Sequence, residues 1–316
     1  MEMRHALLRW FDSGSADADD QASGASGASG ASRIDWLRVL PFVVLHVACI
    51  GAWWTGVSAT AVVTAVALYA IRMFGITAFY HRYCSHRAFV TSRATQFVLA
   101  LIAGAAAQRG PLWWASHHRH HHANSDQPQD VHSARQHGFL WSHIGWFLAS
   151  GNFSARSGLV PDLARFAELR WLDRFDVAAP LTLIAMLYVT GEALAVNFPG
   201  LQTNGAQLVV WGFCISTIVL YHATFTINSL AHRFGTRRYA THDDSRNNPW
   251  LALLTFGEGW HNNHHHFPGS ASQGFFWWEI DITYWGLRFL QRLSLVWNLR
   301  EVPTAMLCAR LEPEGI

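Results

Sequence analysis

Residues 39–74 read "VLPFVVLHVACIGAWWTGVSATAVVTAVALYAIRMF", a stretch with a single charged residue, Arg72. Thr55 and Gly56 divide it into two apolar segments, residues 39–54 and 57–74. A bilayer core about 30 Å thick requires about 20 helical residues, so each segment is near the minimum length for a transmembrane helix. We therefore expect these residues to form a helical hairpin that crosses a membrane twice.

A second pair of apolar segments lies further along the chain, at residues 178–196 and 207–226. Of the 316 residues, 51% are hydrophobic and 14% are charged, and the mean hydropathy is +0.10. This composition is too apolar for an ordinary soluble enzyme. The sequence predicts an all-α integral membrane protein with four transmembrane helices in two hairpins and a helical cap that carries the histidines.

The distribution of arginine predicts which side of the membrane the cap occupies. Every basic residue is an arginine, and none lies in the hairpin connections, residues 55–56 and 197–206. Nearly all lie in the termini and in residues 75–177 and 227–302, so we expect these parts and the active site to be cytoplasmic. The net charge of +2, without a basic stripe, argues against nucleic acid as a partner.

The folded membrane domain is expected to cover residues 34–302. Residues 12–32, "DSGSADADDQASGASGASGAS", have too little apolar surface to fold, so we expect residues 1–33 to be a disordered tail. Residues 303–316 are expected to form a C-terminal tail. The apolar stretches 97–107 and 139–149 are too short to span a bilayer and are expected to be re-entrant or interfacial helices, and residues 274–299 an interfacial amphipathic helix.

Histidines cluster in the segments that follow the second and fourth apolar stretches. His81 and His86 are spaced His-x4-His, "HHRHHH" covers residues 117–122, His232 stands alone, and "HNNHHH" covers residues 261–266. Histidine is the commonest metal ligand among protein side chains. The clusters therefore predict a metal site in the cap.

The spacing indicates how many imidazoles this site could use. In a helix, positions i, i+3 and i+4 share one face, so His-x-x-His-His presents three imidazoles in one direction. Residues 117–122 contain the pattern in two registers, starting at His117 or at His118, and residues 261–265 contain it once. With His81, His86 and His232 these groups supply nine imidazoles, enough for two metal ions with open positions. Ligation by nitrogen alone suits iron, copper or zinc.

Neutral imidazole ligands need hydrogen-bond partners that fix their tautomers. The candidates near the clusters are Asn228, Asp126, Asp130 and Glu258. Isolated histidines such as His46, His143 and His222 are interpreted as packed or hydrogen-bonded residues. The four cysteines are scattered and indicate neither a disulfide framework nor a zinc ribbon.

These motifs resemble those of the membrane-bound fatty acid desaturases, specifically the acyl-CoA Δ9 (stearoyl-CoA type) branch. "GITAFYHRYCSHRAF" at 75–89 is similar to the first histidine box of the family, and "WWASHHRHHH" at 113–122 to the second. "NSLAH" at 228–232 is similar to an added Asn-x3-His element, and "GEGWHNNHHHFP" at 257–268 to the third box. The second box of the family has Arg after its first histidine, which aligns with Arg119 and selects the register starting at His118.

The resemblance implies a di-iron centre, Fe2+ or Fe3+, with Asn228 near one metal. The implied ligands are His81, His86, His118, His121, His122, His232, His261, His264 and His265. It also implies O2-dependent introduction of a cis double bond at C9 of a saturated acyl-CoA, in unsaturated fatty acid biosynthesis. Electrons would come from NAD(P)H through a reductase and a separate carrier, ferredoxin-like or cytochrome b5-like.

A narrow apolar tunnel would determine which carbons of the acyl chain face the metals. The candidate tunnel or cap residues beside the boxes are Trp113, Trp114, Trp146 and Trp260. Animal members of the branch carry Arg-Asp before the second box, whereas this chain has Ser116 and His117, so the acyl carrier could instead be a lipid or a carrier protein. The arginines that could replace the missing cation are Arg109, Arg135 and Arg156.

Two other functions stay open from the sequence. Related histidine boxes occur in membrane hydroxylases and ketolases, which insert oxygen, and product analysis distinguishes these from desaturases. The second alternative is a histidine-rich metal-binding or transport protein, which would be expected to place metal-binding side chains inside the spans. The apolar segments contain only His46, His222, Arg72 and Glu192, with no obvious relay.

Overall fold

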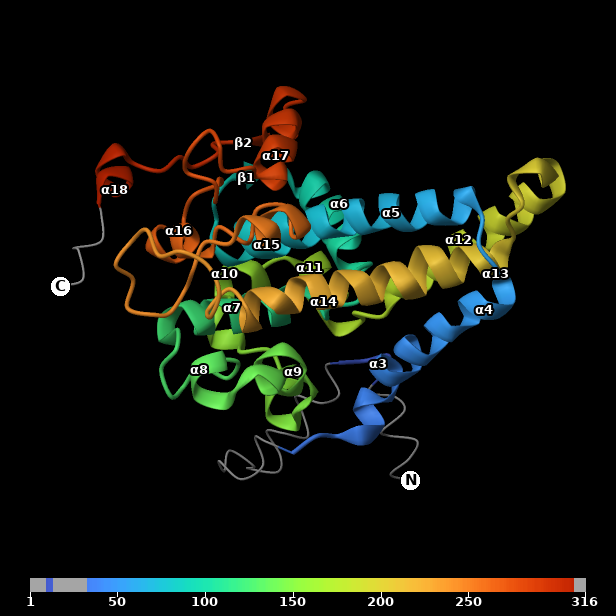
Figure 1. The fold of residues 1–316 in the computed structure, drawn as a ribbon, viewed down its shortest axis with the longest axis horizontal. Coiled ribbons are helices and arrows are strands. Elements are labelled where there is room, and N and C mark those ends of the chain that lie inside the picture. The colour runs from blue at the N-terminus through green and yellow to red at the C-terminus, as the bar shows by residue number, and fades with distance from the viewer. Residues whose placement is uncertain (1–9, 14–32, 310–316) are drawn as a thin grey trace.

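The computed structural model describes residues 10–13 and 33–309, and Figure 1 shows its elements. Most of the tail expected at residues 1–33, and residues 310–316 of the expected C-terminal tail, lie outside the described residues. The described chain is mostly helical. Four of its helical stretches are long and apolar enough to cross a membrane: Trp36–Thr55, Ala59–Ser85, Ala178–Asn197 and Gly205–Ser229.

These four stretches form two hairpins. Residues 59–85 and 205–229 run along the long axis, whereas residues 36–55 slant across it and pack against the second hairpin (Figure 1). The first hairpin consists of α3 (Trp36–Ala48), η1 (Cys49–Gly51) and α4 (Ala52–Thr55), followed by α5 (Ala59–Phe74) and η2 (Gly75–Ser85). The second consists of α12 (Ala178–Asn197), η6 (Pro199–Leu201), α13 (Gly205–Leu208), η7 (Val209–Ile215) and α14 (Ser216–Ser229).

Hydrogen bonds join the turns of the two hairpins. The Ser58 hydroxyl accepts from the N–H of Ala61 at the start of α5 and donates to the side-chain oxygen of Gln207, at 3.1 and 2.7 Å. The Gln207 amide donates in turn to the carbonyl of Thr55 at 2.9 Å. Buried polar groups are normally hydrogen-bonded within the protein. These bonds meet that requirement and fix the hairpins relative to each other.

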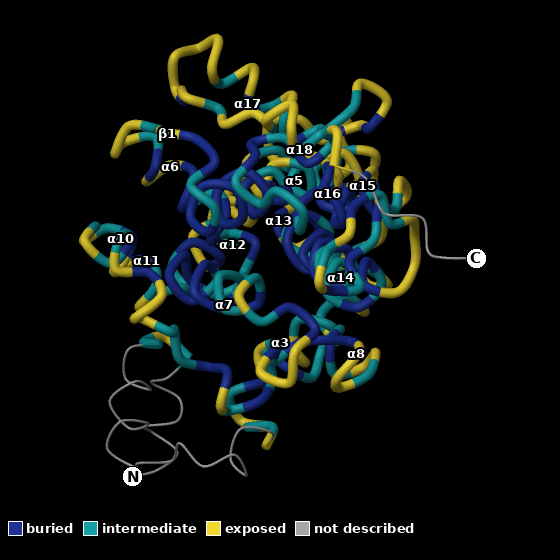
Figure 2. The backbone as a smooth tube through the Cα atoms, turned by 90° about the vertical axis from the view of Figure 1, so that its left-hand side faces the viewer, coloured by how far each residue is buried: buried dark blue, intermediate teal, exposed yellow. Residues whose placement is uncertain are grey.

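The remaining elements form the cap at one end of the hairpins. They are β1 (Val90–Thr91), α6 (Arg93–Gly104), α7 (Pro111–Asn124), α8 (Ala134–His137), η3 (Trp141–Gly145), α9 (Trp146–Leu148), η4 (Ser150–Asn152), η5 (Ser157–Leu159), α10 (Pro161–Ala164), α11 (Ala167–Arg174), α15 (Pro249–Leu254), α16 (His261–His266), α17 (Ile282–Arg292), β2 (Val296–Trp297) and α18 (Thr304–Cys308). β1 and β2 pair antiparallel, with Val90 opposite Trp297. Viewed along the long axis, α7 is largely buried, whereas α17 lies at the exposed periphery (Figure 2).

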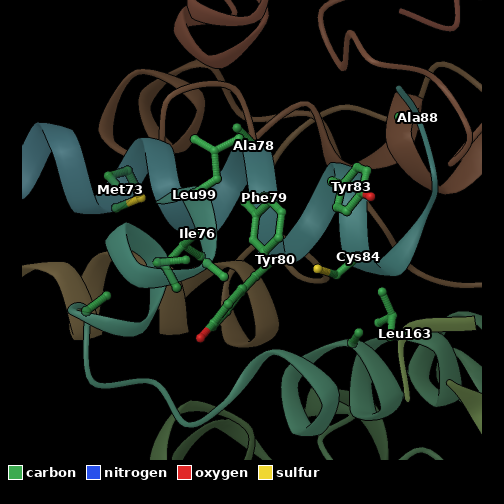
Figure 3. Close-up of a cluster of buried hydrophobic side chains, with 14 of the residues drawn as sticks. Met73, Ile76, Ala78, Phe79, Tyr80, Tyr83, Cys84, Ala88, Leu99 and Leu163 are labelled. Carbon is green, nitrogen blue, oxygen red and sulfur yellow. The ribbon is translucent and has the colours of Figure 1, made fainter. Parts of the chain in front are cut away.

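The second apolar helix continues without a break into the cap. After Phe74 its backbone widens into the π-helix η2, in which every residue is buried. Figure 3 shows Phe79, Tyr80 and Tyr83 along this helix, with Leu99 of α6 packed in the same cluster. π-helical turns are rare and occur frequently at functional sites. Here η2 carries His81 from the membrane helix into the cap.

Arg72 is the one charged residue of α5, and it lies almost completely buried between the two hairpins. Its guanidinium donates to the hydroxyls of Thr217 and Ser216, at 2.6 and 2.7 Å, and to the carbonyls of Gly212 and Ala105, at 3.3 Å each. A charge at this depth is tolerated because these oxygens replace its hydration. The guanidinium therefore links α5 to η7, α14 and the segment after α6.

We expect Arg72→Leu to destabilise the protein by at least about 2 kcal/mol, because hydrogen bonds to a charged group are lost and the Thr217 hydroxyl loses its donor. The measurement is thermal unfolding in detergent. Arg93→Leu, which removes an exposed arginine of α6, serves as the control. An unfolding temperature equal to that of the wild type for Arg72→Leu would contradict the assigned role.

Candidate metal centre

Four separate parts of the fold supply the clustered histidines. His81 lies on η2 and His86 directly follows it, α7 carries the second cluster, His232 follows α14, and α16 carries the third cluster. The Asp173 carboxylate fixes the start of α7, because it accepts hydrogen bonds from the N–H groups of Leu112 and Trp113 at 2.8 and 2.9 Å. Such a cap satisfies donors that have no partner within the helix.

The structure places the nine predicted histidines in two groups, and within each group the ligand nitrogens lie within 4.8 Å of one another. The first group contains His81, His86, His118, His122 and His264. The second contains His121, His232, His261 and His265. One turn of α7 supplies both groups, since His118 and His122 join the first and His121 joins the second. His117 and His120 belong to neither.

The Nε2 atoms of these rings face one another at short distances. In the first group, the Nε2 atom of His264 lies 3.0 Å from that of His81 and 2.9 Å from that of His122, and the Nε2 atoms of His86 and His118 are 2.8 Å apart. In the second group, the Nε2 atoms of His232 and His261 are 3.0 Å apart.

Buried carboxylates determine the tautomer of four of these rings. The Nδ1–H of His121 donates to Asp130 at 2.9 Å, and that of His232 donates to Asp126 at 2.8 Å. The Nδ1–H of His265 donates to Asp243 at 2.5 Å, and that of His81 donates to Glu258. A neutral imidazole that donates from Nδ1 has an unprotonated Nε2. The carboxylates thus direct the lone pairs of these rings toward the centre of each group.

This arrangement fits metal ions. The Nε2 atom of His265 is buried and has no hydrogen-bond partner among the described residues, and the lone pairs of neighbouring rings point at one another. Lone pairs in this arrangement repel unless a cation lies between them, and neutral imidazoles backed by carboxylates are the usual ligands of such a cation. The two groups therefore form a site for two metal ions.

The electrostatics of the site favour the neutral form of six of its histidines, whereas Asp130 raises the pKa of His121. Burial, reinforced by the neighbouring imidazoles, lowers the pKa of five histidines well below the ordinary value: His86, His118, His122, His261 and His264. Burial also lowers the pKa of His265 to about 4, although Asp243 opposes the shift. Only a neutral imidazole binds a metal, so these pKa values suit ligation at neutral pH.

Sequence reasoning selected three of the four carboxylates that hold these rings, namely Asp126, Asp130 and Glu258, and it missed Asp243. Asp243 lies in a loop outside the motifs, so its proximity to His265 had no sequence signal. It also missed Gln273, whose amide lies 3.2 Å from Nδ1 of His81.

The sequence analysis also missed His132, which forms a third potential metal-binding group with His121 and Asp130. The ring of His132 packs 4.3 Å from that of His121 and 4.8 Å from that of Trp146, measured between centroids. Asp130 therefore contacts two histidines, of which only His121 belongs to the nine. The spacing Asp-x-His at residues 130–132 was the available signal.

A cavity of about 410 Å³ begins at the histidines and extends between the hairpins. At one end it is lined by His81, His118, His121 and His261, and at the other by apolar residues such as Leu45 of α3, Ile184 of α12 and Phe213 of η7. The cavity thus connects the metal groups to the part of the molecule that lies within the membrane helices. Its walls are mainly apolar, as an acyl chain requires.

Some of the candidate substrate residues line the cavity and others do not. Trp113, Trp114, Trp146, Arg109 and Asn228 line the cavity. Trp260 does not, and its indole N–H donates to the carbonyl of Ile280. Arg135 is exposed and pairs with Asp244, while the backbone N–H of Arg156 donates to the hydroxyl of Ser116. His117, which the sequence placed outside the ligand set, also lines the cavity.

The comparison with known families decides the class of this protein. The fatty acid desaturase family matches residues 52–300, which include all nine histidines. The chain belongs to the fatty acid desaturase family. Membership accounts for the apolar hairpins, the cap and the paired histidine groups together.

Individual desaturases resemble the chain over most of its length. The sn-2 palmitoyl-lipid 9-desaturase of Nostoc sp. (strain 36) is 35% identical over 83% of this chain and 89% of its own. The sn-1 stearoyl-lipid 9-desaturase of Anabaena variabilis is 37% identical over 85% and 94%. The icosanoyl-CoA 5-desaturase of Limnanthes douglasii is 38% identical over 75% and 63%. The comparisons thus establish a membrane fatty acid desaturase without selecting acyl-CoA as the carrier.

The lowered histidine pKa values predict an acid-sensitive metal-free protein. Unfolded histidines titrate near 6.5, so below that pH the unfolded chain takes up protons that the folded site excludes. The free energy of unfolding therefore has its full value above about pH 6.5 and decreases as the pH falls below it. At pH 5.5 each histidine with a lowered pKa reduces the free energy of unfolding by about 1 kcal/mol.

The measurement is the unfolding temperature of the metal-free desaturase at pH 7.5 and 5.5. The pH effect should shrink in the His86→Ala/His118→Ala double variant, which lacks two of the shifted groups. An unfolding temperature that does not fall on acidification would refute the explanation.

We expect Asp243→Ala to lower the affinity of the site for metal ions by about 10- to 100-fold, because His265 loses the acceptor that fixes its ring. The measurement is the metal content of the purified protein against a competing chelator. Asp244→Ala is the matched control, since the side chain of that neighbour pairs with the exposed Arg135. Equal metal content in the two variants would remove Asp243 from the site.

Proposed function

We propose that this desaturase uses two iron ions to introduce a cis double bond at C9 of a saturated acyl chain held by a membrane lipid. The observation that carries the proposal is the pair of neutral histidine groups at the end of a long, mainly apolar cavity. The reaction converts one O2 molecule, two electrons and two protons, with two hydrogens of the chain, into two water molecules.

The iron ions would supply the oxidising power that an unactivated methylene group requires, since no protein side chain can do so. Their ligands would be the nine histidines of the two groups: His81, His86, His118, His122 and His264 for one ion, and His121, His232, His261 and His265 for the other. Asp126, Asp130, Asp243 and Glu258 would hold the rings from behind. Asn228, in the cavity wall, would lie beside the site.

The role of the protein in this chemistry is to position the acyl chain and exclude water. Trp113, Trp114 and Trp146 would form the rigid wall that presents one pair of carbons to the metals. Because the cavity continues between the membrane helices, the methyl end of the chain would extend toward Leu45 and Ile184. The depth of that end would set the position of the double bond.

Two observations support a lipid as the acyl carrier. The relatives from Nostoc and Anabaena are named for acyl chains bound at the sn-2 and sn-1 positions of lipids. In addition, Ser116 and His117 stand where animal members of the acyl-CoA branch carry Arg-Asp. The icosanoyl-CoA relative supports acyl-CoA as a second candidate carrier.

We further propose that residues 34–302 form the catalytic domain, with residues 75–177 and 227–302 on the cytoplasmic side. Nearly all arginines lie in these segments and in the termini, and none lies in the hairpin turns. A cytoplasmic cap places the metal groups within reach of a separate ferredoxin-like or cytochrome b5-like carrier and its NAD(P)H reductase.

Expression of the chain with a compatible electron donor is expected to yield new cis-9 monoenes, found by mass spectrometry of derivatised fatty acids after separation of lipid and acyl-CoA fractions. His265→Ala should insert into the membrane normally but form no product, because one metal loses a ligand. Product that appears first in the acyl-CoA fraction would favour the second carrier. Hydroxylated chains, or product from His265→Ala, would contradict the proposed reaction or ligand set.

A further inference from the structure

A loop at the end of the cap, residues 233–246, connects α14 to the segment before α15. We call it the basic loop. It lies at the end of the molecule opposite the hairpin turns (Figure 1). If the hairpins cross the membrane, the basic loop is therefore on the far side of the cap from the bilayer, where a water-soluble protein can reach it.

The basic loop is hydrogen-bonded to the outer side of the four-histidine group. The carboxylate of Asp243 accepts from Nδ1 of His265 at 2.5 Å. The backbone N–H of Asp244 donates at 2.9 Å to Asp126, the carboxylate that accepts from His232. Two ligands of this group are thus joined to the loop by one or two hydrogen bonds. Neither His232 nor His265 lines the acyl cavity, so the loop and the cavity approach the site from different sides.

Of the four arginines in the loop, Arg238 pairs with Glu279, whereas the other three have no carboxylate partner among the described residues. Arg233 and Arg246 each donate to a backbone carbonyl, of Ala134 and Gly235 respectively, and Arg237 donates to the backbone and hydroxyl of Thr241. None of the three pairs with a described carboxylate. By contrast, Arg87 in the first box and Arg119 in the second share Asp162.

We infer that the basic loop is the docking surface for an acidic one-electron carrier protein, and that electrons enter through the four-histidine group. The inference rests on the proposed function, because desaturation consumes two electrons that must come from outside the chain. Each docking event transfers one electron from the reduced carrier to the metal pair, and the oxidised carrier then leaves. Unpaired arginines favour this partner by attracting its acidic surface over a distance comparable with the Debye length.

The test uses the metal-loaded full-length desaturase and a reduced plant-type [2Fe–2S] ferredoxin as the probe. The docking variant is R233E/R237E/R246E. The matched control is R165E/R170E/R292E, which makes the same change in net charge at three exposed arginines elsewhere on the cap. Ferredoxin binding is measured directly by thermophoresis at low and high salt, and turnover is measured as a function of ferredoxin concentration.

We expect the docking variant to bind ferredoxin at least about tenfold more weakly and to need a correspondingly higher concentration for turnover, while the control behaves as the wild type. High salt should weaken wild-type binding and remove the difference between the proteins. The milder R233Q/R237Q/R246Q variant should fall between the two. Equal weakening by both glutamate variants, or by neither, would overturn the docking site.

A single turnover without ferredoxin separates a role of the arginines in docking from a role in supporting the metal site. The desaturase is reduced chemically and then mixed with lipid substrate and O2, and the docking variant should form as much monoene as the wild type. Loss of that product in an iron-loaded docking variant would show that the arginines support the site itself, contrary to the inference. No monoene from the wild type in this assay would reject the proposed function instead, and the binding data would still decide whether the loop docks ferredoxin.

Discussion

The structure depends on nine imidazoles that converge in two groups in the interior of the cap. Their burial and mutual proximity make the protonated forms costly, so the pKa of most of these rings lies below the ordinary value. Without a cation, however, the facing lone pairs at about 3 Å repel one another. The fold must therefore hold the rings in an arrangement that only metal ions make favourable, and the surrounding elements are organised to do so.

Carboxylates on distant segments provide that support. Asp126, which follows α7, holds His232 at the end of α14, and Glu258, which precedes α16, holds His81 on η2. Glu258 is itself bound by Arg82, which also contacts Asp281 beyond the third histidine cluster. A buried charge is stable only when it is paired and hydrogen-bonded, so each of these links requires the others. The cap is consequently joined across its whole width by the groups that orient the ligands.

The membrane helices contribute the other half of the arrangement. Because α5 continues into η2, the position of His81 is fixed by a helix that is anchored in the hairpins, and Arg72 connects that helix to the second hairpin. The cavity follows the same direction, from the histidines to the apolar side chains of α3 and α12. The cavity and the basic loop therefore reach the histidine groups from different sides, so that in our proposal substrate and electron carrier would be bound at the same time.

The sequence by itself determined the all-α class and the four apolar helices, because a hydrophobic segment of sufficient length has few alternatives in a bilayer. It also indicated the histidine clusters, since the i, i+3, i+4 spacing on a helix is a local property, while the register starting at His118 rested on the resemblance to the desaturase boxes. Their division into groups of five and four was decided only by the tertiary structure, as was the selection of His118 and His122 for one group and His121 for the other. The roles of Asp243, Gln273 and His132 likewise had no local signal strong enough to assign them, because each depends on contacts between segments far apart in the chain. Local spacing fixes the direction of a side chain relative to its own helix, whereas the partner it meets depends on how the helices pack.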